Sequence, residues 1–204
     1  MFDNKTIEKI LFVLIVSLNT LHAGLGDFLT ADPKPLIGFE GGYSSISIDT
    51  NRNLIIPGNN SGETSDYSAA ELGFKLGTQG RNYRAFATAR NYFVGDELNY
   101  LATFGVELQY LFNIHPMMNI FLGLNAGYLM SELKISDENS KRDFDGAYFG
   151  GDIGVNYHIT SDYDLEFGIH YVTSDAEDDT TAIKYQFDSM WSGYVSFIIP
   201  FTLD

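Results

Sequence analysis

Apolar and polar side chains alternate with a period of two along most of this chain. Residues 100–112 show this most clearly, because the run Phe104-Gly-Val-Glu-Leu-Gln-Tyr110 places its apolar side chains on one face and its polar side chains and glycine on the other. A period of two is that of a β-strand with one apolar face. After residue 23, no segment of useful length has the period of an amphipathic helix. We therefore expect an all-β protein.

The alternation recurs in eight segments. They cover about residues 36–47, 67–77, 82–92, 100–112, 120–131, 149–159, 165–171 and 181–201. The connections around residues 78–81, 113–118 and 160–163 are short, whereas those around residues 49–66, 93–99, 132–145 and 174–180 are mostly longer and more polar. Short turns at one end and long loops at the other are typical of a membrane barrel, with the turns in the periplasm and the loops outside the cell. The sequence predicts an all-β fold, an eight-stranded antiparallel up-and-down transmembrane β-barrel.

A soluble eight-stranded barrel is the alternative, with its apolar face inside. Three features favour lipid on the apolar face: its side chains are too bulky for so narrow a lumen, glycines gather on the polar face, and aromatic residues lie near both ends of the strands. We expect one aromatic belt toward the long loops, made of Tyr43, Tyr92, Tyr100, Tyr128, Tyr171 and Tyr185. We expect a second toward the short turns, made of Tyr83, Tyr110, Phe112, Tyr157, Phe197 and Phe201. The lumen is then expected to be polar and lined with glycine.

Residues 1–23 have the outline of a secretory signal peptide. Lys5 and Lys9 precede the apolar run Ile10–Leu18, and Ala23 stands at a plausible cleavage position. The apolar run is too short to span a bilayer, which takes about 20 residues. We expect residues 24–204 to form the outer-membrane β-barrel domain of an exported chain.

The composition excludes several functions. The chain has 12 Lys and Arg against 27 Asp and Glu, which gives a formal net charge of −15 and argues against a nucleic-acid partner. It has no cysteine, so thiol catalysis and cysteine-ligated metals are excluded.

Charged residues recur along the face that we assign to the lumen. Charges in a narrow lumen must pair or be hydrated. We expect a salt-bridge plug, with a gated narrow pore as the alternative; Glu40, Lys75, Arg84, Glu107 and Glu166 should lie at similar depths, nearer the short turns. The predicted lumen charge cluster consists of Glu40, Glu71, Lys75, Arg84, Glu107, Asp152 and Glu166. The same face should also carry Arg90, His158, His170, Lys184 and Asp188.

An enzymatic function is less favoured by the sequence than a non-enzymatic one. A serine hydrolase needs a nucleophile, a histidine base and an acid within hydrogen-bond reach. The one candidate group that is close together in the sequence is His170, Ser174 and Asp175. The alternation places His170 in the lumen, whereas an enzyme acting on lipid needs its base at the lipid-facing surface. We expect no enzymatic activity and no catalytic, cofactor-binding or metal-binding residues.

The signal peptide, eight strands, loop asymmetry and amphipathic last strand together resemble the small outer-membrane barrels of Gram-negative bacteria, of the OmpA-transmembrane-domain and OmpX-like group. The resemblance covers roughly residues 35–201. It implies a charged lumen and a final strand that is the signal for the outer-membrane assembly machinery. That signal comprises Trp191, Gly193, Val195, Phe197 and Phe201.

The long loops carry the remaining candidates. An acidic extracellular loop contains Asp175, Glu177, Asp178 and Asp179. It could bridge divalent cations to lipopolysaccharide phosphates, or be an ordinary solvated loop. We expect a monomeric outer-membrane protein with a structural, envelope-integrity role or a surface-interaction role through its loops; the alternatives are a narrow ion or small-solute pore and a lipid A-modifying enzyme.

Overall fold

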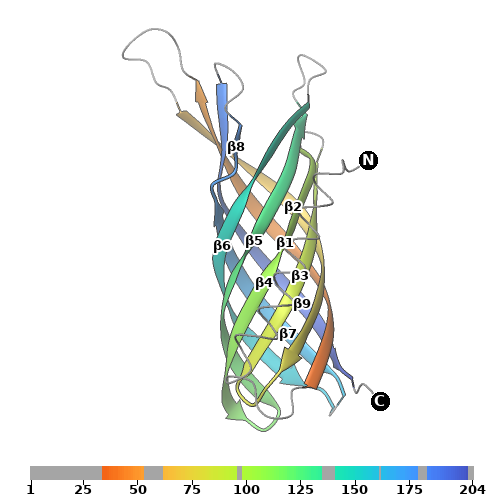
Figure 1. The fold of residues 1–204 in the computed structure, drawn as a ribbon. Helices are drawn as coiled ribbons and strands as arrows, with labels where there is room; N and C mark the ends of the chain where they lie inside the picture. The colour runs from red at the N-terminus through yellow and green to blue at the C-terminus, as the bar shows by residue number, and fades with distance from the viewer. Residues whose placement is uncertain are drawn as a thin grey trace.

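The computed structural model describes residues 34–52, 62–95, 98–134, 141–160, 162–178 and 183–201. They form a closed antiparallel barrel in which each strand pairs with the next and the last strand returns to the first (Figure 1). The barrel strands are β1 (Lys34–Arg52), β2 (Gly62–Gln79), β3 (Tyr83–Val94), β4 (Leu98–His115), β5 (Met118–Lys134), β6 (Lys141–His158), β7 (Asp164–Ser174) and β9 (Ile183–Pro200). The two-residue β8 (Glu177–Asp178) is an addition at the rim that pairs with β9. The predicted eight-stranded up-and-down barrel is confirmed.

The expected signal peptide at residues 1–23 lies outside the described residues, as does the middle of the first long loop. Within the described ranges, no helix is long and apolar enough to cross a bilayer.

Several strands are longer than the alternation predicts. The first segment, expected over about residues 36–47, spans 19 residues as β1, and its neighbour β2 spans 18. A membrane strand needs about 9–11 residues, so these strands continue beyond the lipid. Figure 1 shows the ends of β1 and β2, with the start of β9 beside them, and the paired ends of β5 and β6 rising past the rest of the barrel. Strand pairing beyond the lipid does not require an apolar face, so the alternation of apolar and polar residues does not reveal these extensions.

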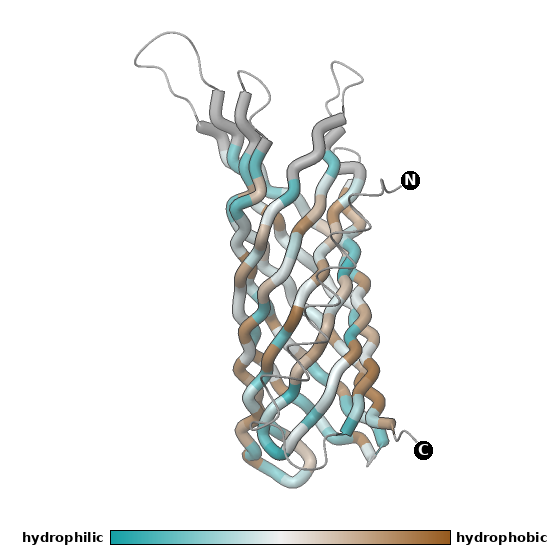
Figure 2. The backbone as a smooth tube through the Cα atoms, viewed as in Figure 1, coloured by the Kyte–Doolittle hydropathy of each residue, from teal (hydrophilic) through white to brown (hydrophobic). Residues whose placement is uncertain are grey.

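The barrel exterior is apolar. Large apolar side chains of every barrel strand are exposed, among them Leu72 at 59% and Leu122 at 56%, and hydrophobic and hydrophilic residues alternate along the strands in Figure 2. Aromatic rings pair near both ends: Tyr83 and Tyr110 lie 4.8 Å apart toward the short turns, and Tyr171 and Trp191 lie 4.7 Å apart toward the long loops. An apolar band flanked by aromatic rings is the exterior of a membrane barrel.

Among the side chains that the structure describes, three lie on the face opposite to the expected one. Tyr92, expected in the outer aromatic belt, points into the lumen and is 3% exposed. The alternation predicts Phe187 on the exterior and Asp188 in the lumen. In the structure Phe187 is buried in the lumen, and Asp188 is exposed outside. The cause is a bulge in β9 opposite Ser47, where Asp188 is an extra residue and the alternation changes phase.

The lumen is also less polar than expected, because its half toward the long loops is filled by apolar side chains. We call this set the apolar layer. It consists of Ile46, Ile48, Ala69, Tyr92, Leu101, Leu129, Tyr148, Val172, Ala176, Phe187 and Met190. Two smaller apolar clusters lie toward the short turns: Leu36, Phe86 and Ile198, and Leu111, Phe121 and Tyr194.

Candidate functional site

Charged side chains from six strands converge in the lumen between the apolar layer and the short turns. Alternation directs each of them inward, and all are at most 5% exposed. We call this set the ionic layer. It consists of Glu40, Glu71, Lys75, Arg84, Arg90, Glu107, Asp152, Asp164 and Glu166.

Lys75 lies at the centre of the ionic layer. Its Nζ is 2.8 Å from Glu40 Oε2, 3.1 Å from Glu107 Oε1 and 3.0 Å from Glu166 Oε1. These carboxylates come from β1, β4 and β7, so one ammonium group joins strands across the lumen. The ring of Tyr194 lies over Nζ, with its centroid at 4.7 Å, and a side chain at position 168 in place of glycine would meet that ring.

Two arginines complete the network. Arg90 donates from Nε to Glu40 Oε1 at 2.6 Å and from Nη2 to Glu107 Oε2 at 2.6 Å. Arg84 pairs with Asp164 and lies 3.5 Å from Glu166 Oε2. Because each cation bridges at least two carboxylates, the loss of one leaves more than one buried charge without its partner.

Neutral side chains bond the remaining carboxylate lone pairs. Gln109 Nε2 donates to Glu107 Oε1 at 2.8 Å and to Glu166 Oε2 at 3.1 Å. Ser196 donates to Glu40 Oε2 at 2.9 Å. Such bonds are what a buried ionic network needs in order to offset desolvation.

The structure therefore brings together five members of the predicted cluster, linked directly or through one shared carboxylate: Glu40, Lys75, Arg84, Glu107 and Glu166. Arg90 joins them from the same inward face. Asp164 belongs to the network too, but sequence reasoning missed it because it directly follows a short turn, before any alternation is visible.

Glu71 and Asp152 stand apart from the other predicted members. The described cation nearest Glu71 is Arg90, at 3.4 Å. Asp152 accepts a hydrogen bond from Asn125, and its other oxygen, Oδ2, has no hydrogen-bond partner among the described residues. The ionic layer has six carboxylates and three side chains that are always cationic, so its charge is not balanced by its own lysine and arginines.

The residues of the hydrolase alternative do not form a catalytic group. His170 is 1% exposed inside the lumen. Ser174 Oγ donates to the carbonyl of Ala147 at 2.8 Å and accepts from the amide of Ala176 at 3.2 Å, so it is bonded to rim backbone.

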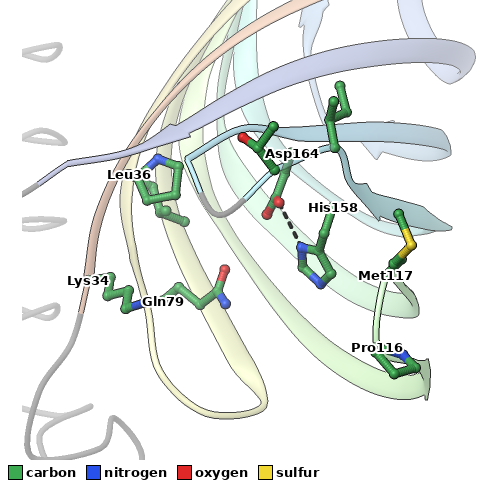
Figure 3. A pocket seen from close by; sticks show the side chains of 10 residues that line it. Lys34, Leu36, Gln79, Pro116, Met117, His158 and Asp164 are labelled. Atoms are coloured by element: carbon green, nitrogen blue, oxygen red, sulfur yellow. Dashed lines mark hydrogen bonds and ion pairs between the residues drawn. The ribbon is translucent and has the colours of Figure 1, made fainter.

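The periplasmic mouth holds a second polar group. His158 Nδ1 and Asp164 Oδ1 are 2.6 Å apart, and Asn119 Nδ2 lies 3.1 Å from His158 Nε2. His158 and Asp164 border a cavity of about 460 Å³ between the ends of β1, β2 and β7 and the turn at Pro116 (Figure 3). Asp164, a member of the ionic layer, is one of the residues that line this cavity.

The acidic loop is partly ordered by backbone pairing. Glu177 and Asp178 form β8 against β9, and the amide of Phe187 donates to the carbonyl of Ala176 at 3.0 Å. Asp175 and Glu177 are exposed. Asp179 lies outside the described residues.

The residues assigned to the assembly signal lie on the last strand where it closes the barrel against β1. Trp191, Gly193, Val195 and Phe197 are exposed on the apolar exterior. Phe201 follows the strand, and its amide donates to the carbonyl of Pro35 at 3.0 Å.

No protein-family model matches the sequence, and no curated protein matches it significantly. Solved structures do match. Neisserial surface protein A, NspA, is 14% identical at a TM-score of 0.57, over 80% of this chain and 97% of that one. The outer membrane protein OprG from Pseudomonas aeruginosa is 14% identical at a TM-score of 0.52, over 86% of this chain and all of that one. The outer membrane protease OmpT from Escherichia coli is 8% identical at a TM-score of 0.47, over 84% and 98%.

At such identities the likeness concerns the fold. The fold is that of small bacterial outer-membrane β-barrels, as the sequence pattern predicts. The exposed apolar band is the surface that this fold presents to lipid.

Proposed function

We propose that this outer-membrane barrel has no enzymatic activity and acts through its outer rim, as a structural component of the envelope that engages surface ligands or lipopolysaccharide. The observation that carries the proposal is the filled lumen. Across the described strands, the apolar layer and the ionic layer lie in series along the barrel axis. A narrow lumen filled by packed and ion-paired side chains leaves no continuous water path.

The rim supplies the surface for such a role. At the long-loop end, β1 and β2 stay paired as far as Asn51 and Gly62, which holds acidic side chains above the lipid. Ser47 donates to Asp66 at 2.6 Å, and Thr64 donates to Asp49 at 2.6 Å. These bonds orient carboxylates that a divalent cation could bridge to lipopolysaccharide phosphate.

Two features of the exterior support the partners that we propose. The apolar exterior suits outer-membrane lipid, and the exposed face of β9 suits recognition by the assembly machinery. We propose a monomer, because a barrel that closes upon itself has no free strand edge to pair with another chain.

Complementation separates a role at the rim from a role in the lumen. A strain without the protein is tested for detergent resistance after expression of the wild type or of a rim variant, Asp49→Asn, Asp66→Asn, Asp175→Asn and Glu177→Gln. Asn and Gln keep an oxygen acceptor, so the strands should still pair. The control carries His115→Gln and Asp162→Asn, exposed at the opposite end.

We expect the wild type and the control to restore resistance and the rim variant to fail, at equal amounts of folded protein. Full rescue by the rim variant would contradict the proposal. Along the described strands, the packed lumen argues against the narrow pore. The hydrolase alternative is disfavoured because His170 is buried in the lumen while Ser174 is bonded to rim backbone.

A further inference from the structure

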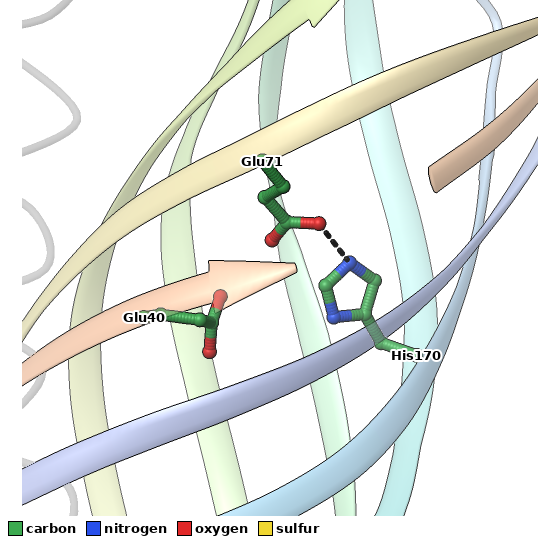
Figure 4. Close-up of side chains that lie close together, drawn as sticks. All are labelled: Glu40, Glu71 and His170. Atoms are coloured by element: carbon green, nitrogen blue, oxygen red, sulfur yellow. Dashed lines mark ion pairs between the residues drawn. The ribbon is translucent and has the colours of Figure 1, made fainter. Parts of the chain in front are cut away.

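His170 is a buried histidine without a hydrogen bond. It lies on β7 and is 1% exposed, and neither of its ring nitrogens has a hydrogen-bond partner among the described residues. The carboxylate that faces it is that of Glu71, whose Oε2 lies 3.7 Å from Nε2, which is too long for a hydrogen bond (Figure 4). A buried polar group in a native protein is expected to have a partner.

Glu71 faces this histidine with free acceptor capacity. Its Oε1 has no hydrogen-bond partner among the described residues, while its Oε2 accepts from Ser44 Oγ at 2.9 Å. Ser44 in turn lies 2.6 Å from Ser192 Oγ. The oxygen nearest His170, Oε2, is therefore held in place by the barrel wall, whereas Oε1 lies 3.4 Å from Arg90 Nε.

Glu40 lies on the other side of the same space (Figure 4). One ligand atom each from Glu40, Glu71 and His170 lie within 4.8 Å of one another. All of these residues are buried, so the grouping differs from an acidic patch exposed to solvent.

We propose that Glu71 and His170, with Glu40 as a third ligand, hold a divalent transition-metal ion such as Zn²⁺ in the lumen. One imidazole nitrogen and carboxylate oxygens are a donor set that such ions take. Ser44 positions the Glu71 ligand, as an outer-shell hydrogen bond commonly does.

The charge of the surroundings supports a cation here. The ionic layer contains six carboxylates against one lysine and two arginines, and Glu71 is the carboxylate with the least cationic contact next to this space. Arg90 lies at 2.6 Å from Glu40 and opposes a second cation. The other oxygen of Glu40, Oε2, lies 2.8 Å from Lys75 Nζ and accepts from Ser196 at 2.9 Å. Glu71 and His170 therefore form the main part of the site, and Glu40 contributes only the lone pair of Oε1 that Arg90 leaves.

A metal ion here would join β1 and β2 to β7 across the lumen. The apolar layer lies above it and the lysine-centred network below it. We therefore expect the ion to enter before the barrel closes and to exchange slowly afterwards, so loading has to take place during folding.

The test uses the full chain, extracted in detergent, unfolded in urea and refolded with Co²⁺ or Zn²⁺. After free metal is removed, we expect one equivalent of metal per folded chain and a visible Co²⁺ absorption spectrum. Binding should also raise the midpoint of urea unfolding, because the ion favours the folded state. Glu71→Gln and His170→Asn should each lose the metal.

Two further variants separate binding from folding. His158→Asn, at the periplasmic mouth, should keep the full equivalent, and Ser44→Ala should lower the apparent affinity about 10-fold. Folding of every variant is checked by heat-modifiable migration on gels. Metal in the wild type equal to that in folded Glu71→Gln would overturn the proposal. The proposal is equally overturned if Glu71→Gln fails to fold and wild type refolded with metal carries none.

Discussion

The two layers of the lumen fill the same narrow space by different means. In the ionic layer, one side chain, Lys75, contacts three carboxylates, and specificity comes from distances and hydrogen bonds. In the apolar layer, side chains such as Phe187 and Met190 are almost wholly buried and are held by packing. Both layers exclude water, but they respond differently to change. An ion pair that loses one partner leaves a buried charge, whereas a packed cluster that loses a side chain leaves a cavity.

The largest effect is expected in the ionic layer. Lys75→Met keeps much of the side-chain volume but leaves Glu40, Glu107 and Glu166 without their shared cation. We expect the free energy of unfolding to fall by about 4 kcal/mol, since breaking a buried pair typically costs about 3–5 kcal/mol. Urea unfolding in detergent measures the loss.

Lys34→Met is the matched control, because Lys34 is exposed at the edge of β1. A loss no larger than that of the control would mean that the ionic layer does not need its central cation.

A somewhat smaller effect is expected in the apolar layer. Phe187→Ala should lower the free energy of unfolding by about 3 kcal/mol, because it removes a buried ring and leaves a cavity. Phe187→Leu, which keeps most of the volume, should lose much less. Equal losses for the two substitutions would show that the layer is loosely packed.

A third change tests the contact between glycine and aromatic ring that supports Lys75. A Cβ built at Gly168 would lie 2.5 Å from Cζ of Tyr194. Gly168→Ala should therefore lower the free energy of unfolding by about 2 kcal/mol through overpacking. The loss should shrink in a Tyr194→Leu background, which lacks the ring, and an unchanged loss there would show that the cost at position 168 does not come from this ring.

The smallest effect is expected at Asp188, just outside the apolar layer. Asp188→Asn should change the free energy of unfolding by no more than about 0.5 kcal/mol, because the side chain is exposed. The sequence interpretation placed this carboxylate in the lumen, where its neutralisation would have a large effect. A large change in the free energy of unfolding would indicate that Asp188 lies in the lumen and that β9 has no bulge at this position.

The alternation predicts the strand number and the direction of most charged side chains, because both depend on local parity. The pattern of short and long connections predicts the antiparallel up-and-down order. Parity fails at the β9 bulge, where one extra residue turns Phe187 into the lumen and Asp188 to the exterior. The alternation also does not reveal the apolar layer. Inward-facing residues such as Ile48, Leu101 and Leu129 are as apolar as the exterior, so the two faces show no contrast there.

The partners within the ionic layer depend on barrel closure. Lys75 and Glu166 are 91 residues apart in the chain, and their contact follows from the tilt and register of strands that are not neighbours. The sequence supplies the charged residues and their inward direction, whereas the geometry of the closed barrel decides which of them meet.

The central claim is that the two layers together close the lumen. Conductance of the purified full chain in planar lipid bilayers tests this most directly, with insertion verified by heat-modifiable migration of the same preparation. We predict no stable channel conductance above the membrane baseline. Stable, porin-sized conductance steps from the folded protein would contradict the account.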